Sequence, residues 1–420
     1  MELFIWKESL TDVRSFFRLR TFDSLRIRDF RFLWATMWCT NSSQWVENVA
    51  IGWLTFQVTQ SALLTTFSVG AGAIPYLVVG PVGGVLIDAW DRRKLFLTAL
   101  ALSFIATTIF VAVVLLDLVR TWHIFAFMLV SGSLRTFRYG VEAALVSNIV
   151  PRDRLINGFA LNTFTGSATR ASVPAITGLL VALIDVGFTL VVSVLLAGFA
   201  LLVAFPIGSR PQMKHPVSLT TIVRDIAEGA QYLKKTPKVI VLTILTVIPI
   251  LLIAPINIGL MPVYTQEVFK SGPEALGLLI TAFGIGMSIA TIVLASVGEI
   301  LYKARAMVLS LIGTALGVLI YSHISVLPIA FIVAMGYSTV LMMVYVIHSG
   351  AIQEVIPDQV RGRVTTLLSA GFITFPVGTL LVGSLAQEFG ARTAVVVAAC
   401  AMLAVVMVFV AYYRRVLTMT

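Results

Sequence analysis

Polar and ionisable side chains interrupt stretches of this sequence that are otherwise apolar. In the first stretch Asn41, Gln44 and Asn48 are three or four residues apart, and Glu47 comes three residues after Gln44. On a helix this spacing places them on one face or close to it. A carboxyl group in apolar surroundings can take up and release a proton, and amides can bind polar parts of a substrate. These four residues are candidates for a proton or substrate pathway.

A second group of charges lies farther along the chain. Arg135, Arg138 and Glu142 share a helical face, and Arg138 and Glu142 have the spacing of a salt bridge. Arg170 follows in the next apolar stretch. We expect Glu47 or Glu142 to take up a proton, while the arginines hold it ionised or meet an anionic part of the substrate. The alternative is an ion network between helices that only stabilises the fold.

The second half of the chain has no comparable charges. Its polar residues include Asn257, Tyr345 and His348. A lone histidine is more often a packing residue than a proton site, although its titration range suits proton coupling. The two halves are therefore asymmetric, one charged and one rich in Phe and Met, which suits an amphipathic substrate.

The composition around these residues is that of a membrane protein. Apolar residues make up 58% of the 420 residues and charged residues 12%, against about 45–50% and 25% in soluble domains. Stretches such as 95–116 and 394–412 contain no charge and have the length that a helix needs to cross a bilayer. The net charge of +10 does not indicate a nucleic-acid partner, because the cations form no soluble basic face.

Apolar stretches separated by Pro, Gly and charged residues predict twelve spanning helices. Six lie near 31–57, 62–89, 95–117, 121–148, 156–184 and 187–208, and six near 239–266, 275–300, 306–322, 325–352, 364–387 and 391–413. Most of the thirty Lys and Arg residues then fall in alternate loops, the bias expected of cytoplasmic loops, and only Arg120, Lys270 and Arg392 fall in the others. We therefore expect both termini in the cytoplasm, with residues 1–30 as an amphipathic leader on the membrane.

The two sets of six spans correspond to each other. Pro151 follows the fourth span and Pro357 the tenth, half a chain apart and in similar surroundings. With the same half-chain offset in sequence, His348 of the second half corresponds to Glu142 of the first half. The alternative to an internal repeat is that the two loops are unrelated and that each needs proline to stop a helix. The repeat predicts two pseudo-symmetric six-helix bundles at 31–208 and 239–420, joined by a cytoplasmic loop at 209–238, with the substrate between them.

The loop after the second span carries the most specific motif. Gly83 and Gly84 precede Asp88, and the basic residues 92–94 follow. This resembles the cytoplasmic signature of the major facilitator superfamily, which latches the cytoplasmic side shut. Gly84 is expected to permit close helix approach. The resemblance implies that Asp88 meets the start of the eleventh span and that Arg92 meets an acid after the fourth. The expected gate residues are Gly84, Asp88, Arg92, Arg93, Asp153 and Arg361.

Two further segments narrow the resemblance. Residues 45–61 and 352–364 are similar to the exporter branch that includes enterobactin exporters and macrolide efflux proteins. This implies an all-α fold of twelve transmembrane helices in two bundles. It also implies a monomeric multidrug-type proton antiporter of the cell inner membrane, in contact with lipids, which exports small amphipathic molecules such as drugs or siderophore-like compounds.

The sequence also departs from proton-coupled exporters. These often carry Arg-x-x-Gln-Gly in the fourth span, where this chain reads Arg135-Thr-Phe-Arg138-Tyr-Gly140. The glycine-rich antiporter signature of the fifth span is reduced to Gly166, Pro174 and Gly178.

Other functions stay open at this point. One is a lipid or lysolipid translocator of the same fold, and another is a transporter-like receptor or membrane enzyme. The sequence contains no nucleotide-binding loop or hydrolase motif, and its four histidines lack metal-ligand spacing. We therefore expect no catalytic residue, no metal, no cofactor and no nucleic-acid partner.

Overall fold

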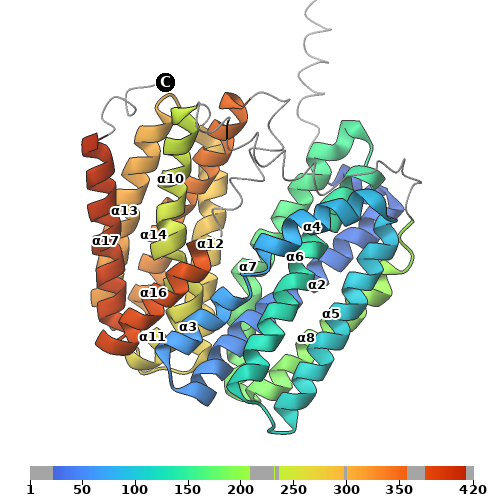
Figure 1. Ribbon diagram of the computed structural model, residues 1–420, viewed down its shortest axis with the longest axis horizontal. Helices are drawn as coiled ribbons and strands as arrows, with labels where there is room; N and C mark the ends of the chain where they lie inside the picture. The colour runs from blue at the N-terminus through green and yellow to red at the C-terminus, as the bar shows by residue number, and fades with distance from the viewer. Residues whose placement is uncertain (1–21, 209–230, 232–235, 298–299, 357–373, 413–420) are drawn as a thin grey trace, which may run out of the picture.

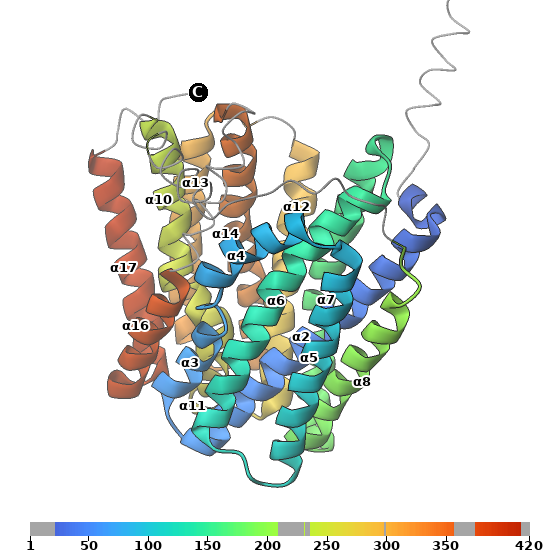
Figure 2. The same cartoon turned by 45° about the vertical axis from the view of Figure 1, so that its right-hand side comes forward.

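The structure is a computed structural model that describes residues 22–208, 231, 236–297, 300–356 and 374–412. Within these ranges five side chains are not described: Leu77, Pro81, Val85, Asp88 and Pro237. All regular elements in the described ranges are helices. They form two groups, which we call the first lobe (α2 to α8) and the second lobe (α10 to α17), and which lie side by side in Figures 1 and 2.

The first lobe follows the predicted order of spans. Its helices are α2 (Arg28–Thr59), α3 (Ala62–Ala71), α4 (Tyr76–Ala89), α5 (Arg92–Leu115), α6 (Thr121–Ile149), α7 (Leu155–Leu183) and α8 (Val186–Ala204). Short 3₁₀ turns precede α2 and α7, at Asp23–Arg26 and Arg152–Arg154. Side-chain caps explain several helix starts, since Ser61, Asp91 and Asp185 each accept a hydrogen bond from a backbone N–H of the first turn.

The second lobe has the same order with different interruptions. Its elements are α10 (Pro237–Leu252), η3 (Ile256–Leu260), α11 (Met261–Glu267), α12 (Pro273–Val297), α13 (Lys303–His323), α14 (Leu327–Val355), α16 (Thr374–Phe389) and α17 (Ala391–Tyr412). The predicted domain boundaries at 209–238 fall mostly outside the described residues and stay predictions.

The predicted second span is not one continuous helix. A turn separates α3 from α4 between Gly72 and Pro75. Helix α6 crosses this turn closely, because a Cβ added at Gly132 would lie 2.1 Å from the carbonyl oxygen of Gly72. The close crossing therefore requires a residue without a side chain at position 132.

The predicted seventh span is also interrupted. It consists of α10, the π-helix η3 and α11. Three prolines occupy this region, Pro249, Pro255 and Pro262, and each lacks the N–H that would continue the helical hydrogen-bond pattern. Single π-helical turns inside helices occur frequently at functional sites.

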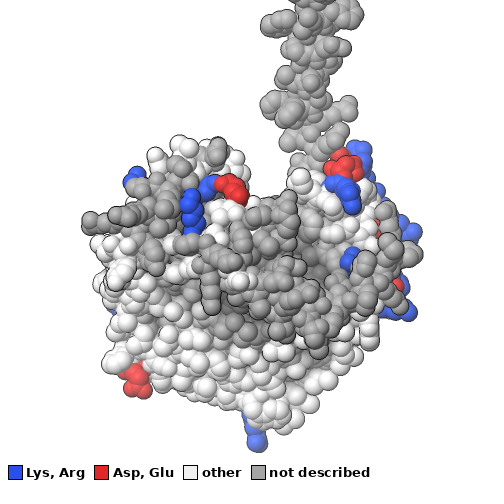
Figure 3. All heavy atoms as spheres, turned by 45° about the horizontal axis from the view of Figure 1, so that its top comes forward, with Lys and Arg blue, Asp and Glu red and all other residues white. Residues whose placement is uncertain are grey.

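The outer surface of the bundle is apolar. Along α8, for example, Leu195, Phe199 and Leu202 are 66%, 56% and 67% exposed. The turn between α4 and α5 marks one end of the molecule, the α4–α5 end, and the turn between α7 and α8 marks the other, the α7–α8 end. In Figure 3 the Lys, Arg, Asp and Glu side chains lie mostly around the α4–α5 end, and the flanks are largely uncharged. This is the surface of a protein embedded in lipid.

Eight helices in the described ranges are long and apolar enough to cross a membrane. Four predicted spans are not among them. Two are α2 and α6, which carry the charged groups considered below, the third is the interrupted pair α3 and α4, and the fourth is α16, for which 364–373 lie outside the described residues. For these four, membrane crossing stays a prediction.

The two lobes meet through glycines near the α7–α8 end. A Cβ added at Gly178 of α7 would lie 2.9 Å from the Cα of Gly277 of α12. A Cβ added at Gly383 of α16 would lie 3.0 Å from the Cα of Leu63 of α3. These backbone approaches join the lobes at this end, toward which the helices converge in Figure 1.

Candidate proton and substrate site

Glu47 lies inside the first lobe and is 8% exposed. Its carboxylate accepts hydrogen bonds from Thr107 Oγ1 of α5 at 3.1 Å, from Ser131 Oγ of α6 at 3.3 Å and from Ser43 Oγ of its own helix at 3.5 Å. Among the described residues no Lys or Arg side chain lies within the 4.0 Å of an ion pair with this carboxylate. The described hydrogen-bond partners of Glu47 are therefore all hydroxyl groups.

A small polar cavity adjoins Glu47 between α2, α5, α6 and α8. Its lining includes Thr40, Gln44, Ser103, Arg135 and Arg138 in addition to Glu47 and its partners. Its volume is about 50 Å³, enough for a few water molecules. A drug-sized ligand needs roughly 300 Å³ or more. The cavity can hold water beside Glu47, but it is too small to be a substrate pocket.

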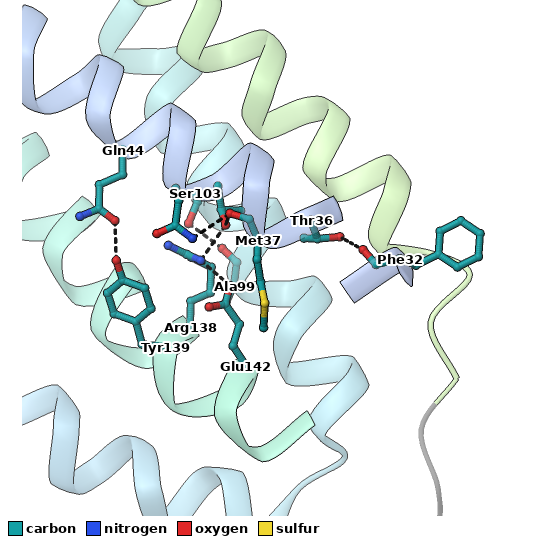
Figure 4. Close-up of polar contacts among 11 residues, drawn as sticks. Phe32, Thr36, Met37, Gln44, Ala99, Ser103, Arg138, Tyr139 and Glu142 are labelled. Carbon is teal, nitrogen blue, oxygen red and sulfur yellow. Dashed lines mark hydrogen bonds and ion pairs between the residues drawn. The ribbon is translucent and has the colours of Figure 1, made fainter. Parts of the chain in front are cut away.

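Arg138 and Glu142 form a buried ion pair within α6, with side-chain exposures of 5% and 3% (Figure 4). The salt bridge indicated by their spacing is thus confirmed. Arg138 Nη1 also donates to Thr40 Oγ1 of α2 at 2.8 Å. The guanidinium lies 4.9 Å from the ring centroid of Tyr139. Each charge of this pair therefore already has an opposite charge beside it.

Of the four polar residues of α2 that the spacing predicts on or near one face, Gln44 and Glu47 line the cavity, whereas Asn41 and Asn48 do not. Gln44 lines the cavity and accepts a hydrogen bond from Tyr139 Oη at 2.6 Å, as Figure 4 shows. Asn41 bonds the carbonyl of Met37 in its own helix. Asn48 lies one turn before Gly52, where an added Cβ would lie 3.2 Å from Pro262 of α11, so it points toward the second lobe.

Arg135 lines the same cavity as Glu47 but makes a different contact. Its Nη2 donates to the carbonyl oxygen of Gly72 at 3.2 Å. The turn between α3 and α4 leaves this carbonyl available. Arg135 therefore holds the interruption of the second span against α6, and it does not join the ion pair of Arg138.

Arg170 occupies the middle of α7, where the two lobes meet. The guanidinium lies 5.5 Å from the ring centroid of Trp45 of α2, and Nη1 lies 3.0 Å from Met287 Sδ of α12 in the second lobe. Its Nε is buried and has no hydrogen-bond partner among the described residues. Met287 lies far from Arg170 in sequence, so the spacing of the sequence does not indicate this contact.

The second lobe contains neutral polar contacts at its core. Tyr337 Oη donates to Asn257 Oδ1 of the π-helix at 2.9 Å, and Tyr264 Oη donates to the carbonyl of Ser322 at 3.3 Å. His348 has a buried Nε2 without a hydrogen-bond partner among the described residues. Tyr345 is half-buried. His348 is not part of the cavity beside Glu47.

The predicted gate residues lie at the α4–α5 end, but their contacts differ from the prediction. Arg92 Nη1 donates to the carbonyl of Ala144 at 3.2 Å. Asp153, its expected partner, is exposed and lies 3.6 Å from Arg154 Nε instead. The expected pair of Arg92 with Asp153 is therefore wrong for this conformation, because Asp153 lies in the turn beyond α6, whereas Arg92 donates to a carbonyl within α6.

Two other parts of the gate prediction are also revised. The close approach expected at Gly84 occurs at Gly83, where an added Cβ would lie 3.1 Å from the Phe137 ring. A Cβ added at Gly84 would have no described atom of another helix within 4 Å. Arg93 donates to the carbonyl of Phe205 at 2.7 Å, so it holds the chain after α8. Arg361 and the Asp88 side chain lie outside what the structure describes.

The hydroxyl partners of Glu47 are absent from the predicted site. Ser43 is one turn before Glu47 in the same polar stretch, and this spacing could have identified it. Thr107 and Ser131 lie on other helices, and their rotation toward Glu47 depends on packing that no local pattern reveals.

The two-lobed helical fold is that of the major facilitator superfamily, a class of membrane transporters. The chain matches the model of the transmembrane secretion effector family over residues 19–418. It therefore belongs to this family and is a multi-pass membrane transporter of the efflux and secretion type, not an enzyme.

Individual relatives are distant but cover most of the chain. Macrolide efflux protein A of Streptococcus pyogenes is 22% identical over 371 residues, which are 86% of this chain and 90% of that protein. The Staphyloferrin A transporter of Staphylococcus aureus is 22% identical over 82% of this chain and 86% of its own length. A bacterial homologue of the human lysosomal transporter Spinster has the same fold, with a TM-score of 0.73 at 12% identity, over 93% of this chain and 97% of that one.

Proposed function

We propose that this protein is a proton-coupled exporter of small amphipathic molecules that works by alternating access, with Glu47 as the proton carrier. The proposal places it in the cell inner membrane as a monomer with both termini in the cytoplasm. Relatives named for macrolide efflux and for staphyloferrin A support export of compounds of this general kind. The neighbouring charges of α6 and α7 complete the site.

The observation that carries this proposal is the set of three hydroxyl partners around the buried carboxyl of Glu47. A hydroxyl group can donate to a carboxylate or accept from a carboxylic acid by rotating about one bond. Glu47 can therefore be hydrogen-bonded in both protonation states. The water-sized cavity beside it gives a proton a route to this group.

Glu142 is less suited to this role. Its ion pair with Arg138 already neutralises the carboxylate, and protonating it would leave the buried guanidinium without an opposite charge. Such a loss costs several kcal/mol. We therefore assign Glu142 to the stability of the first lobe and Glu47 to proton coupling.

The contacts of the lobes are compatible with a rocking mechanism. Glycine contacts join the lobes from the α7–α8 end as far as Arg170, whose carbonyl oxygen would lie 2.6 Å from a Cβ added at Gly284 of α12, so we infer that exchange of the substrate between the two sides requires them to separate. In the proposed orientation the α7–α8 end is the outer end of the molecule, and we therefore assign the conformation seen here to the inward-facing side of the cycle.

Transport by purified full-length protein in proteoliposomes tests the proposal. A labelled macrolide and an amphipathic fluorescent dye serve as cargo, with and without an imposed pH gradient. We expect the gradient to accelerate transport of at least one of them in the wild type. Glu47→Gln should abolish this acceleration and leave exchange without a gradient, because glutamine keeps the shape but cannot titrate.

The control is Glu388→Gln, which removes a carboxyl from an exposed position. It should transport as the wild type does. Gradient-driven transport that survives Glu47→Gln would refute the assignment of the proton. Flipping of labelled lipid without any gradient, together with no transport of either cargo, would favour the lipid translocator instead.

A further inference from the structure

Arg170 differs from Arg135 and Arg138 in having no oxygen acceptor for its guanidinium among the described residues. Arg138 is paired with Glu142, and Arg135 is bound to the Gly72 carbonyl. Within the described part of the chain no carboxylate lies within 4.0 Å of Arg170. Its described contacts are the Met287 sulfur, which is a weak acceptor, and the face of the Trp45 ring.

This arrangement is costly unless it serves binding. A charge in the bilayer centre costs about 2.5–3.5 kcal/mol on insertion scales, and such charges usually have a partner or line a pathway. Arg170 lies near the middle of α7, with Nε buried and without a hydrogen-bond partner among the described residues. A guanidinium has five N–H donors in a fixed plane. Most of these N–H groups therefore have no hydrogen-bond acceptor among the described residues.

The position of Arg170 fits a substrate better than a structural partner. It lies between the lobes, since Trp45 belongs to the first lobe and Met287 to the second. In transporters of this architecture the substrate lies at the midplane between the lobes. A ligand bound there would contact both lobes, and it would leave one of them whenever the lobes separate.

The chemistry around Arg170 selects the ligand class. A planar guanidinium pairs with a carboxylate through two parallel hydrogen bonds. One carboxylate balances one guanidinium, whereas a doubly charged phosphate would bring a second charge with no described partner at this place. Trp45 and Met287 beside it offer an aromatic face and a flexible apolar chain. Together they match an anionic group attached to an apolar body.

We propose that Arg170 is the binding residue for a carboxylate on the transported molecule, so that this protein prefers amphipathic monocarboxylates to neutral molecules of the same shape. The inference deepens the proposed function and rests on it for the role of the bound molecule. Arg170 binds the anion while Glu47 carries the proton, so the two events occur on different helices of the same lobe.

Equilibrium binding to the purified full-length protein tests this inference. The probes are 11-(dansylamino)undecanoate and its methyl ester, which differ only in the charge of the terminal group. Dansyl fluorescence reports binding of each. We expect the wild type to bind the carboxylate at least about tenfold more tightly than the ester, the size of a charge-assisted hydrogen-bonded pair.

Two variants and one control separate binding from folding. Arg170→Gln should lose the preference and keep the ester affinity, and Arg170→Lys should keep part of the preference because the charge remains. Arg152→Gln removes an exposed arginine and should bind as the wild type does. The retained ester affinity shows that the variants are folded.

The outcomes are distinct from those of the transport experiment. Equal affinity of the wild type for the two probes, or binding of neither, would overturn the carboxylate inference. A preference that persists in Arg170→Gln would overturn the assignment to this residue. In each case gradient-driven transport that depends on Glu47 can still be observed, so the proposed function would stand.

Discussion

The buried ion pair of Arg138 and Glu142 allows a quantitative prediction. Removing one member of a buried pair leaves an uncompensated charge and costs roughly 3–5 kcal/mol. For Glu142→Gln we expect the lower end, about 3 kcal/mol, because glutamine keeps an oxygen that can accept from Arg138. At about 2–4 °C per kcal/mol for a folding unit the size of one lobe, thermal unfolding in detergent should shift down by roughly 6–12 °C.

A second ion pair supplies the matched control. Lys303 and Glu354 also form an ion pair, but their side chains are 23% and 62% exposed. Exposed pairs contribute about 0–1 kcal/mol, so Glu354→Gln should lower the melting temperature by less than about 4 °C. Both proteins are compared in the same detergent and at the same concentration.

A double variant separates the cost of lost charge from the cost of lost packing. Arg138→Met with Glu142→Leu replaces the pair by apolar side chains, a change that is often neutral in protein interiors. It should recover most of the stability lost in Glu142→Gln. Equal shifts for the buried and the exposed pair, or a double variant as unstable as Glu142→Gln, would refute the reasoning.

Two further predictions concern the lobe contact and the second lobe. Gly178→Leu places a side chain against the backbone of α12, so it should slow transport and increase thiol-reagent labelling of Leu63→Cys at the other lobe contact. The control is Gly336→Leu, which has open space around the added side chain. Unchanged labelling would contradict the assignment of Gly178 to the lobe contact. Tyr337→Phe leaves the Asn257 oxygen without its donor and should cost about 1–3 kcal/mol in thermal unfolding, whereas an unchanged melting temperature would show that this hydrogen bond does not contribute.

The sequence predicts the helices well because membrane spans have a strong local signature. A length near twenty residues, the absence of charge and the punctuation by Pro, Gly and Arg are all visible locally. The predicted ends of α6 and α7 agree with the structure to within a residue. The turn after α3 is not predictable in this way, because it lies where α6 crosses closely. The prolines around η3 are visible in the sequence, but they do not specify that the interruption is a π-helix.

The site shows the same division between local and distant contacts. The Arg138–Glu142 pair follows from i,i+4 spacing within one helix. The partners of Glu47 on α5 and α6, and the contact of Arg170 with Met287, depend on how separate helices are rotated and packed. The wrong prediction for Asp153 has the same origin, since a family motif does not specify the conformation in which its contacts form.

The contacts between the lobes determine how easily the lobes can separate. The described hydrogen bonds between the lobes are few and nearly all neutral: Ser61 Oγ donates to Gln387 Oε1 at 2.8 Å, and the Ala175 N–H donates to Thr281 Oγ1 at 3.0 Å. Close packing of glycines also joins the lobes at this end. Separating the lobes there leaves no ion pair broken among the described residues.

Arg170 is a charged residue whose side chain contacts both lobes, Trp45 of the first and Met287 of the second. The proposed rocking would therefore break no described ion pair between the lobes, and it would move the charge of Arg170, the residue that we assign to the substrate. A bound carboxylate would neutralise Arg170 and reduce the cost of moving that charge between two environments. In this scheme substrate binding lowers the barrier to rocking, whereas the buried pair of Arg138 and Glu142 moves as part of a rigid lobe.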